Sequence, residues 1–471
     1  MQPTFYIIIL YMATMIGIGI YASKRKVKSS KDYLLAGRSL GPFMMAGTLA
    51  AAEIGGGSTV GVASKAFGSW GLSAGWYVVC AGIGIFLVSF VAPYLRKSMA
   101  TTVPEIIARR YGGTAHKITT ILAITGLFIA TAVQIIATAS IISVVTGIDL
   151  KLAIIGSGIV VTIYTMLGGL VSVAMTDIVH ILFITIGMAV AAPIIVHNAG
   201  GWSHVVANLP EGQLELTKVG WKTIIGLILM YFMTFSTGQE AVQRYFAAKD
   251  IKTARLGSML CALLMAMYGF IPATIGLVSL AKFPNINPNN AMATAAINFA
   301  PTIIAGLVLS SVVAATMSSA SGNMLAVSTL FTKDVYQRYI NPKADDKKIM
   351  FVSKSLIVFI GSVSLVIALS KTEIIPLLVF AFTLRAAGPF GAFVFGLIYK
   401  KATVNAGLYS LLLGSIAAFI WQYLKEPYGI MAIVLGSAVS TVVFFTVAIV
   451  ESKMGVPPAP PAIIEGMSEE E

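Results

Sequence analysis

Apolar runs of roughly 20 residues recur along the chain, and a run of that length can cross a bilayer as a helix. Short polar stretches, many of them carrying Lys or Arg, separate the runs. The pattern predicts an all-α polytopic membrane protein with about thirteen transmembrane helices. We place them near residues 4–22, 41–66, 71–95, 115–145, 150–168, 173–196, 220–246, 254–281, 301–335, 350–370, 374–399, 404–424 and 428–451.

Two of these runs carry helix-breaking residues near their middle. The second has Gly55, Gly56 and Gly57 in succession beside Glu53, and each glycine costs a helix about 1 kcal/mol relative to Ala. The seventh has a second candidate break at 235–238. Unwound backbone is tolerated in a membrane only where it lines protein or water, and paired broken helices are typical of transporter binding sites. The alternative is a glycine patch for close helix packing.

The ninth run, with its continuation to residue 336, is rich in hydroxyls and small residues. Ala315, Ser318 and Ser319 stand at i, i+3 and i+4, which places them on one helix face. Neutral oxygens that converge near the middle of a membrane suit a small monovalent cation that has shed its water. Alternatively, the small residues allow close helix approach and each hydroxyl bonds its own helix.

Basic residues gather in alternate loops, which sets the predicted orientation. Since Lys and Arg collect on the cytoplasmic side, the N-terminus is expected outside the plasma membrane and the C-terminus in the cytoplasm. An odd number of spans agrees. The Pro-rich, then acidic segment 453–471 is expected to be a short disordered cytoplasmic tail. The loops concerned contain Lys24, Arg25, Lys26, Lys28, Lys31 and Arg38; Arg96, Lys97, Arg109, Arg110 and Lys117; Arg244, Lys249, Lys252 and Arg255; and Lys333, Arg338, Lys343, Lys347 and Lys348.

Composition narrows the function class. Charged residues make up 11% of the chain, less than half of the roughly 25% typical of soluble proteins. Because Lys and Arg of membrane proteins collect in cytoplasmic loops, the net charge of +13 does not indicate nucleic-acid binding. Cys80 and Cys261 lie in apolar runs and suggest neither a disulfide framework nor a metal site. Because no metalloprotease, P-loop or nucleophile-elbow motif occurs, we predict that the protein is not an enzyme. The partners expected are a small-molecule solute and the lipid bilayer, and no obligate protein partner is evident.

Three charged residues inside predicted spans stand out, because a charge there costs about 3 kcal/mol on insertion scales. Arg385 could clamp a substrate carboxylate, pair with Glu53 as a structural ion pair, or face a wet vestibule. Glu53 could pair with Arg385, bind a cationic group of the substrate, hold a cation or take up a proton. Asp177 is the third. His180, three residues later, could titrate, but a lone membrane His is more often a packed hydrogen-bonding residue.

Five fragments in order resemble the sodium:solute symporter family, whose members carry proline, pantothenate, sugars, sialic acid or monocarboxylates. They are KDYLLAGR (31–38), VPEIIARRYGG (103–113), YTMLGGLVSVAMTDIVH (164–180), GQEAVQRYFAAKD (238–250) and SSASGNMLAVSTLFTKDVY (318–336). The resemblance implies a five-plus-five inverted repeat, with one extra helix before it and two after. The repeats would span approximately 41–196 and 220–399, within a single transmembrane domain over residues 1–452.

The resemblance also implies a sodium site. Its ligands would be the carbonyls of Ala51, Ile54 and Ala315 and the hydroxyls of Ser318 and Ser319. Asp177 would assist the ion on its way to the cytoplasm. Na+ is then the coupling ion, and no organic cofactor is expected.

The chain departs from the sugar-carrying members of the family. Glu53 stands where those commonly have Asn, and the gate tyrosine of the seventh span is replaced near Thr234. The predicted function is Na+-coupled symport of a small solute, an amino acid or other carboxylate, into the cell by alternating access. The alternatives are an H+-coupled symporter that uses Glu53 or Asp177, and a transporter-like sensor. The candidate substrate-binding residues are Glu53, Gly56, Tyr231, Thr234, Phe235, Gln239 and Arg385.

Overall fold

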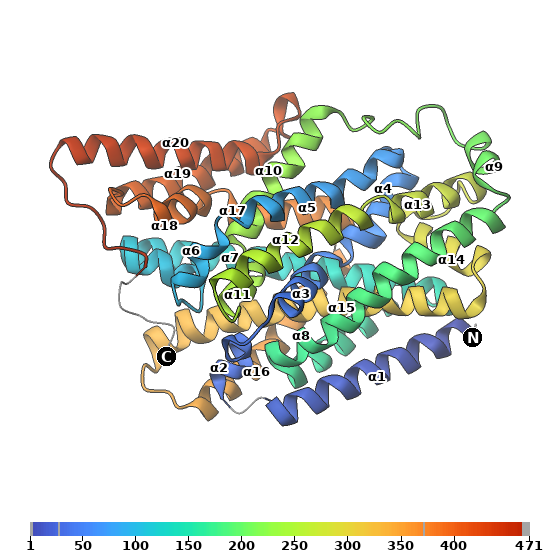
Figure 1. Ribbon diagram of the computed structural model, residues 1–471, viewed down its shortest axis with the longest axis horizontal. Helices are drawn as coiled ribbons and strands as arrows, with labels where there is room; N and C mark the ends of the chain where they lie inside the picture. The colour runs from blue at the N-terminus through green and yellow to red at the C-terminus, as the bar shows by residue number, and fades with distance from the viewer. Residues whose placement is uncertain (1–2, 27–28, 371–372, 464–471) are drawn as a thin grey trace.

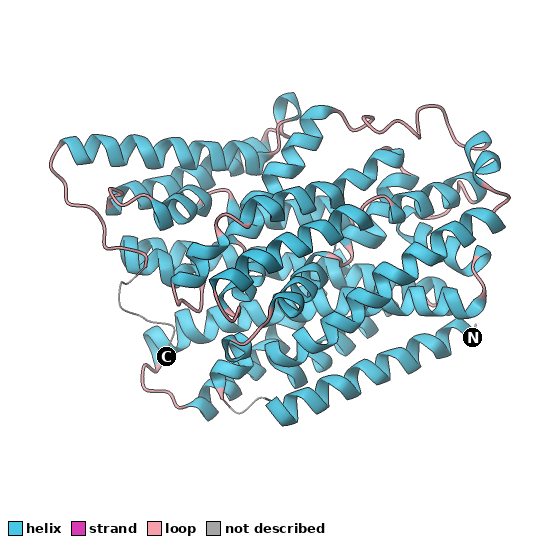
Figure 2. Ribbon diagram, in the orientation of Figure 1, coloured by secondary structure: helices cyan, strands magenta, loops and turns pink. Residues whose placement is uncertain are grey.

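The chain is almost entirely helical. The computed structural model describes residues 3–26, 29–370 and 373–463, and helices make up nearly all of these ranges (Figure 2). Most of the long helices run side by side along the long axis of the molecule (Figure 1). The all-α prediction is confirmed.

The order of elements follows the predicted runs. The helices are α1 (Pro3–Lys26), α2 (Ser30–Leu35), α3 (Pro42–Glu53), α4 (Val62–Phe67), α5 (Trp76–Val88), α6 (Ala92–Lys97), α7 (Val103–Thr146), α8 (Leu150–Asn198), α9 (Trp202–Ala207), α10 (Trp221–Thr237), α11 (Gln239–Phe246), α12 (Ile251–Tyr268), α13 (Ile271–Lys282), α14 (Ala291–Phe299), α15 (Thr302–Leu330), α16 (Asp346–Ser370), α17 (Ile374–Ala386), α18 (Gly396–Ile398), α19 (Val404–Tyr423) and α20 (Ala432–Lys453). Wider π-helical turns are η2 (Gly57–Gly61), η5 (Phe331–Ile340) and η6 (Gly391–Phe395).

Length and apolar composition support the predicted spans. Within the described ranges, eight helices are long and apolar enough to cross a membrane, or nine when the bent pair α17 and η6–α18 is taken as one span. Three shorter apolar helices, 3–18, 150–163 and 221–237, coincide with further predicted runs. The interrupted segment from α3 to α4 coincides with the remaining one.

Both predicted helix breaks are present. α3 ends at Glu53, and the chain resumes helical hydrogen bonding only at Gly57. α10 and α11 are separated by Gly238 alone, whose backbone is extended (φ −71°, ψ 124°). Three glycines therefore open a wide interruption in the first segment, whereas one glycine gives a sharp break in the second.

Two further bends were not predicted. α8 changes direction at Gly169, whose φ of 67° disfavours other residues and whose missing Cβ would lie 2.5 Å from the Tyr33 ring. The structure therefore joins the runs 150–168 and 173–196 through a single residue. α17 is followed by a 45° bend into η6, where Pro389 removes a helical donor.

Loops predicted to be cytoplasmic meet at one end of the bundle. Leu40 and Ala248 form an isolated parallel bridge, and the Arg96 side chain donates to the carbonyls of Ala248 and Lys249 at 2.6 and 3.1 Å. α1 begins at the right of Figure 1, whereas α20 ends at the left. This agrees with termini on opposite sides of a membrane, although which side is cytoplasmic stays a prediction.

The segment after α20 is not free as far as it is described. The Ala459 N–H donates to the Ala402 carbonyl at 2.7 Å, and Arg110 Nη1 donates to the Pro460 carbonyl at 3.1 Å. Ala459 and Ala462 are buried. The part of the predicted tail up to Ala462 therefore packs against the bundle in this structure, and the disorder of the tail stays a prediction. Residues 464–471 lie outside the described ranges.

Candidate functional site

The break after α3 leaves the Ala51 carbonyl without its helical hydrogen-bond donor. In a continuous helix the Ala51 carbonyl would accept from the Gly55 N–H, but that N–H donates instead to the Glu53 carbonyl at 2.7 Å. The Ser319 hydroxyl of α15 donates to the Ala51 carbonyl at 2.9 Å. The structure thus brings together two of the oxygens that the sequence singled out, from helices far apart in the chain.

Small residues allow this close approach. A Cβ on Gly55 would lie 2.5 Å from Ser319 Oγ and 2.6 Å from Gln134 Oε1, so α3, α7 and α15 can meet here only around a glycine. Ile54 directly follows α3 as its C-cap, and its N–H donates to the Ala50 carbonyl at 2.7 Å. Ala315 is buried one turn before Ser319. Uncharged oxygens in so tight a cradle suit a small hard cation.

Ser318 has a different partner from Ser319. Its hydroxyl donates to the Asp177 carboxylate, which also accepts from Thr48 Oγ1 at 2.5 Å. Arg244 Nη2 lies 3.8 Å from the same carboxylate, and Arg244 Nε donates to the Thr48 carbonyl at 2.9 Å. All four side chains are 2% exposed or less. The buried charge of Asp177 is therefore balanced by an arginine.

Arg244 itself corrects the sequence analysis. It was assigned to a cytoplasmic loop, but it lies inside the bundle on α11 and is 1% exposed. Its Nη1 donates to the Glu240 carbonyl one turn earlier. Charge near the end of an apolar run suggested a loop, whereas the Gly238 break lets α11 continue inward with its polar side chains buried.

A cavity lies beside the α3 break, between the two broken segments and α17. Its volume of about 20 Å³ holds about one water molecule, so it is closed around its polar side chains. Three predicted substrate-binding residues line it, namely Glu53, Phe235 and Arg385. The other lining residues are Ala52, Ala130, Gln134, Glu240, Ala241, Asn323, Leu378 and Phe382.

Arg385 pairs with a residue that the sequence analysis did not name. Its Nη1 lies 2.5 Å from Glu240 Oε2, whereas Glu53 Oε1 accepts from the Ser58 hydroxyl at 3.0 Å. The predicted Glu53–Arg385 ion pair is therefore wrong for this conformation, because the glycine turn brings Ser58 back to Glu53. The wet vestibule is also wrong, since Arg385 is 4% exposed. An acid two residues after a mid-span glycine was the available signal for Glu240.

Two other candidates support the walls of the cavity. The Gly56 N–H donates to Gln134 Oε1 at 2.7 Å, and a Cβ at Gly56 would lie 2.3 Å from the Ala137 Cβ. The Tyr231 ring packs edge-on against Tyr77 with centroids 5.4 Å apart. These residues lie behind the lining side chains.

The remaining candidates differ from each other in position. Thr234 is buried, with no hydrogen bond to its hydroxyl within the described residues. Gln239 points to the loop before α7, where its Oε1 accepts from the Val103 N–H at 2.8 Å and its Nε2 donates to the Thr101 carbonyl at 3.1 Å. In this conformation Gln239 therefore fixes a loop instead of lining the cavity.

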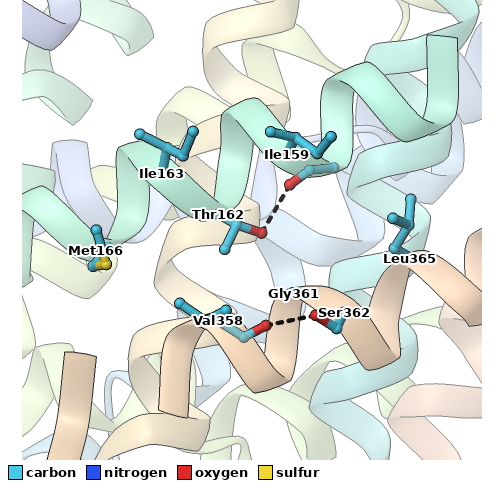
Figure 3. Close-up of a pocket in the computed structure, with 9 residues that line it drawn as sticks. Ile159, Thr162, Ile163, Met166, Val358, Gly361, Ser362 and Leu365 are labelled. Atoms are coloured by element: carbon cyan, nitrogen blue, oxygen red, sulfur yellow. Dashed lines mark hydrogen bonds between the residues drawn. The ribbon is translucent and has the colours of Figure 1, made fainter. Parts of the chain in front are cut away.

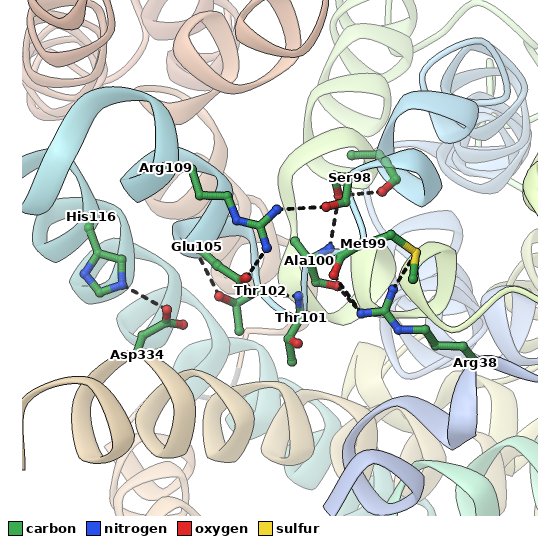
Figure 4. A network of polar contacts seen from close by, with 11 residues as sticks. Arg38, Ser98, Met99, Ala100, Thr101, Thr102, Glu105, Arg109, His116 and Asp334 are labelled. Carbon is green, nitrogen blue, oxygen red and sulfur yellow. Dashed lines mark hydrogen bonds and ion pairs between the residues drawn. The ribbon is translucent and has the colours of Figure 1, made fainter. Parts of the chain in front are cut away.

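That loop belongs to a polar network at the predicted cytoplasmic end (Figure 4). Arg38 donates to the Met99 carbonyl at 2.8 Å, and Arg109 donates to the Ser98 carbonyl at 2.8 Å. Glu105 accepts from the Thr101 N–H at 2.8 Å. Figure 4 also shows the separate His116–Asp334 pair. These contacts tie the loops to α7 and close this end of the bundle.

His180 agrees with the packing interpretation. Its Nδ1 lies 3.2 Å from the Tyr11 hydroxyl, and both side chains are buried where α1 meets α8. The contact attaches the first helix to the bundle and lies apart from the cavity.

A larger cavity of about 270 Å³ between α8 and α16 does not have solute chemistry. Its hydroxyls bond their own helices, with Thr162 donating to the Gly158 carbonyl at 2.8 Å and Ser362 to the Val358 carbonyl at 3.0 Å (Figure 3). Ile159 and Ile163 on its rim are 51% and 53% exposed. It is an apolar groove on the outer surface of the bundle.

Known proteins share both the sequence pattern and the fold. The chain is 26% identical to the rabbit (Oryctolagus cuniculus) sodium/myo-inositol cotransporter 2 over 90% of its own length and 70% of the relative's. It is 26% identical to an osmoregulated proline transporter of Bacillus subtilis over 94% of both chains. A substrate-bound, outward-open Na+-coupled sialic acid symporter superposes with a TM-score of 0.80 at 21% identity, covering 97% of this chain and 98% of that one.

These matches show an inverted-repeat transporter fold and a transporter class in place of an enzyme. The relatives carry different solutes, so they do not single out one for this chain. Residues 33–414 match the sodium:solute symporter family. Since that match covers most of the sequence, the chain belongs to this family of Na+-coupled solute symporters.

Proposed function

We propose that the chain imports a small amino acid or other carboxylate together with Na+ by alternating access. The observation that carries the ion assignment is the contact between Ser319 Oγ and the freed Ala51 carbonyl at 2.9 Å. There an unwound segment meets a straight helix through uncharged oxygens. The proposed ligands are the carbonyls of Ala51, Ile54 and Ala315 and the hydroxyls of Ser318 and Ser319.

The proposed exit for the ion passes Asp177. Because Ser318 already donates to that carboxylate, an ion that leaves the hydroxyl oxygens next meets a negative charge. Thr48 precedes the α3 break, and Asp177 lies near the predicted cytoplasmic start of the run 173–196. The ion would then leave inward as the predicted cytoplasmic network opens.

Coupling follows from the position of the ion beside the solute cavity. Ala51 and Glu53 belong to the same segment, and Glu53 lines the cavity. An ion that fixes this segment shapes the cavity, so ion and solute raise each other's affinity by the same factor. The membrane potential supplies about 2.3 kcal/mol per charge for each 100 mV.

The test is uptake into proteoliposomes by the Ser318→Ala, Ser319→Ala double variant. We expect Na+-stimulated accumulation to be lost while the purified protein stays folded. Ser310→Ala is the matched control, because that buried hydroxyl donates to the Gly306 carbonyl of its own helix, the one partner it has among the described residues. Uptake by the double variant that still depends on Na+ would contradict the ligand assignment.

Two buried carboxylates favour one alternative. If Glu53 or Asp177 titrates, uptake is stimulated by acid, ignores Na+ and loses its pH profile in Glu53→Gln or Asp177→Asn. Accumulation of solute inside vesicles, whether Na+ or H+ drives it, contradicts a sensor without transport.

A further inference from the structure

We propose that the solute is a zwitterion and that it opens the Glu240–Arg385 ion pair on binding. The carboxylate of the solute takes Arg385, and its ammonium group takes Glu240 and Glu53. This inference rests on the proposed function, because it treats the cavity beside the α3 break as the solute site.

The ion pair leaves a polar group unsatisfied. Arg385 Nη1 and Glu240 Oε2 are 2.5 Å apart and satisfy each other as an ion pair, but Arg385 Nε has no hydrogen-bond partner among the described residues. The two side chains are 3% and 10% exposed. A buried ion pair offsets its desolvation only when further hydrogen bonds satisfy both groups. The Arg385 Nε–H group is therefore a buried donor that this ion pair leaves unsatisfied, beside a cavity lined by polar side chains.

The guanidinium is held ready for a planar ligand. Arg385 Cζ lies 4.8 Å from the centroid of the Phe382 ring, which supports one face of the guanidinium. Nε–H and one Nη2–H are parallel on the side of the guanidinium away from the Nη1 contact with Glu240, and two parallel N–H groups match the two oxygens of a carboxylate. Glu240 contacts Nη1 through Oε2 and leaves that edge to a ligand.

The buried charges favour a solute with no net charge. Asp177 and Arg244 balance each other, and Arg385 balances one of Glu53 and Glu240. One carboxylate remains, and one Na+ at the neighbouring oxygens neutralises it. A zwitterion keeps the loaded site neutral, whereas a monocarboxylate adds an uncompensated negative charge at low dielectric. A simple amine adds a positive charge and leaves the Arg385 edge unfilled.

The size of the cavity explains why the pair has to open. At about 20 Å³ it cannot admit any amino acid while Glu240 contacts Arg385. Glu240 belongs to α11 and Arg385 to α17, so a solute that enters between them separates these two helices. Recognition and opening then depend on the same contact.

The first experiment needs no variant. Purified protein in NaCl or choline chloride is titrated with the twenty common L-amino acids, with acids that lack the amine (acetate, propionate, phenylpropionate) and with the matching amino-acid amides, and thermal stability is followed. We expect at least one neutral-side-chain amino acid to raise the melting temperature in NaCl, with its acid and amide analogues about 10-fold or more weaker. An acid analogue that binds as well as its amino acid, or no binding by any zwitterion, would overturn the proposal.

The second experiment uses Glu240→Gln and Arg385→Lys, with exposed Glu373→Gln as the matched control. Both cavity variants should weaken zwitterion binding about 10-fold or more, whereas Glu373→Gln should leave it unchanged. Unchanged zwitterion affinity in a folded Glu240→Gln protein overturns the proposal. Zwitterion binding that is lost in these variants but is equal in NaCl and choline chloride supports the ion-pair assignment and contradicts the proposed Na+ coupling instead.

Discussion

The two broken segments solve the same structural problem with different chemistry. The first is opened by three glycines, which frees the Ala51 carbonyl for Ser319. The second is opened by Gly238 alone and continues into α11, where Glu240 and Arg244 stand four residues apart. Glu240 lines the proposed solute cavity and contacts Arg385, whereas Arg244 contacts Asp177 beside the proposed ion site. The wide break after α3 thus exposes a backbone carbonyl, whereas the sharp break at Gly238 is followed by two buried charged side chains that form ion pairs.

The largest expected effect comes from breaking the charged side of this comparison. Arg244→Gln leaves Asp177 buried without its cation, which should destabilise the protein by about 3–5 kcal/mol. The measurement is the melting temperature in detergent. Asp177→Asn in the same chain should restore most of the loss, and a double variant as unstable as Arg244→Gln would contradict the pairing.

Gly56→Ala tests the first break with a smaller effect. The added methyl carbon would lie 2.3 Å from the Ala137 Cβ, and overpacking of this kind costs about 1–3 kcal/mol. Na+-dependent stabilisation should fall with it, because α3 and α7 are forced apart. Gly156→Ala is the control, since no described atom outside its own helical turn lies within 4 Å of its Cβ position and Ala favours a helix by about 1 kcal/mol. Equal melting temperatures for the two variants would contradict the tight first break.

The smallest effect concerns the connection that follows the second break. Asp250 Oδ1 accepts from the Thr253 N–H at 2.6 Å and caps α12, and this hydrogen bond lowers the pKa of the Asp250 carboxyl. A folded-state pKa below the unfolded value contributes stability above about pH 4, and this is lost as the pH falls through the folded-state pKa. Asp250→Ala should cost about 1 kcal/mol at pH 7.

Denaturation at pH 7 and pH 3 checks this cap. Asp250→Asn keeps a side-chain acceptor but cannot titrate, so its stability difference from the native chain should shrink at pH 3. A difference that is constant across this range would show that the Asp250 charge has no part in capping α12.

Hydropathy and glycine placement were enough to predict the spans and both breaks, because the cost of an interrupted helix is local. The contact of Ala51 with Ser319 could also be anticipated, since family resemblance supplied both positions. The partner of Arg385 could not, because α11 and α17 meet only through the tertiary fold. Arg244 was misassigned for a related reason: a charge near a span end looks alike in sequence whether it faces water or a buried carboxylate. The turn at Gly169 depends on the Tyr33 ring, which no local pattern reveals.

The isolated bridge between Leu40 and Ala248 has a mechanical consequence. It joins the residues just before α3 to those just after α11, so the inner halves of the two interrupted helices are stapled together at one end. When one helix bundle rocks against the other during transport, these two halves would move as one rigid unit and the backbone would bend at the glycine breaks. A disulfide engineered between positions 40 and 248 should therefore leave the transport rate unchanged.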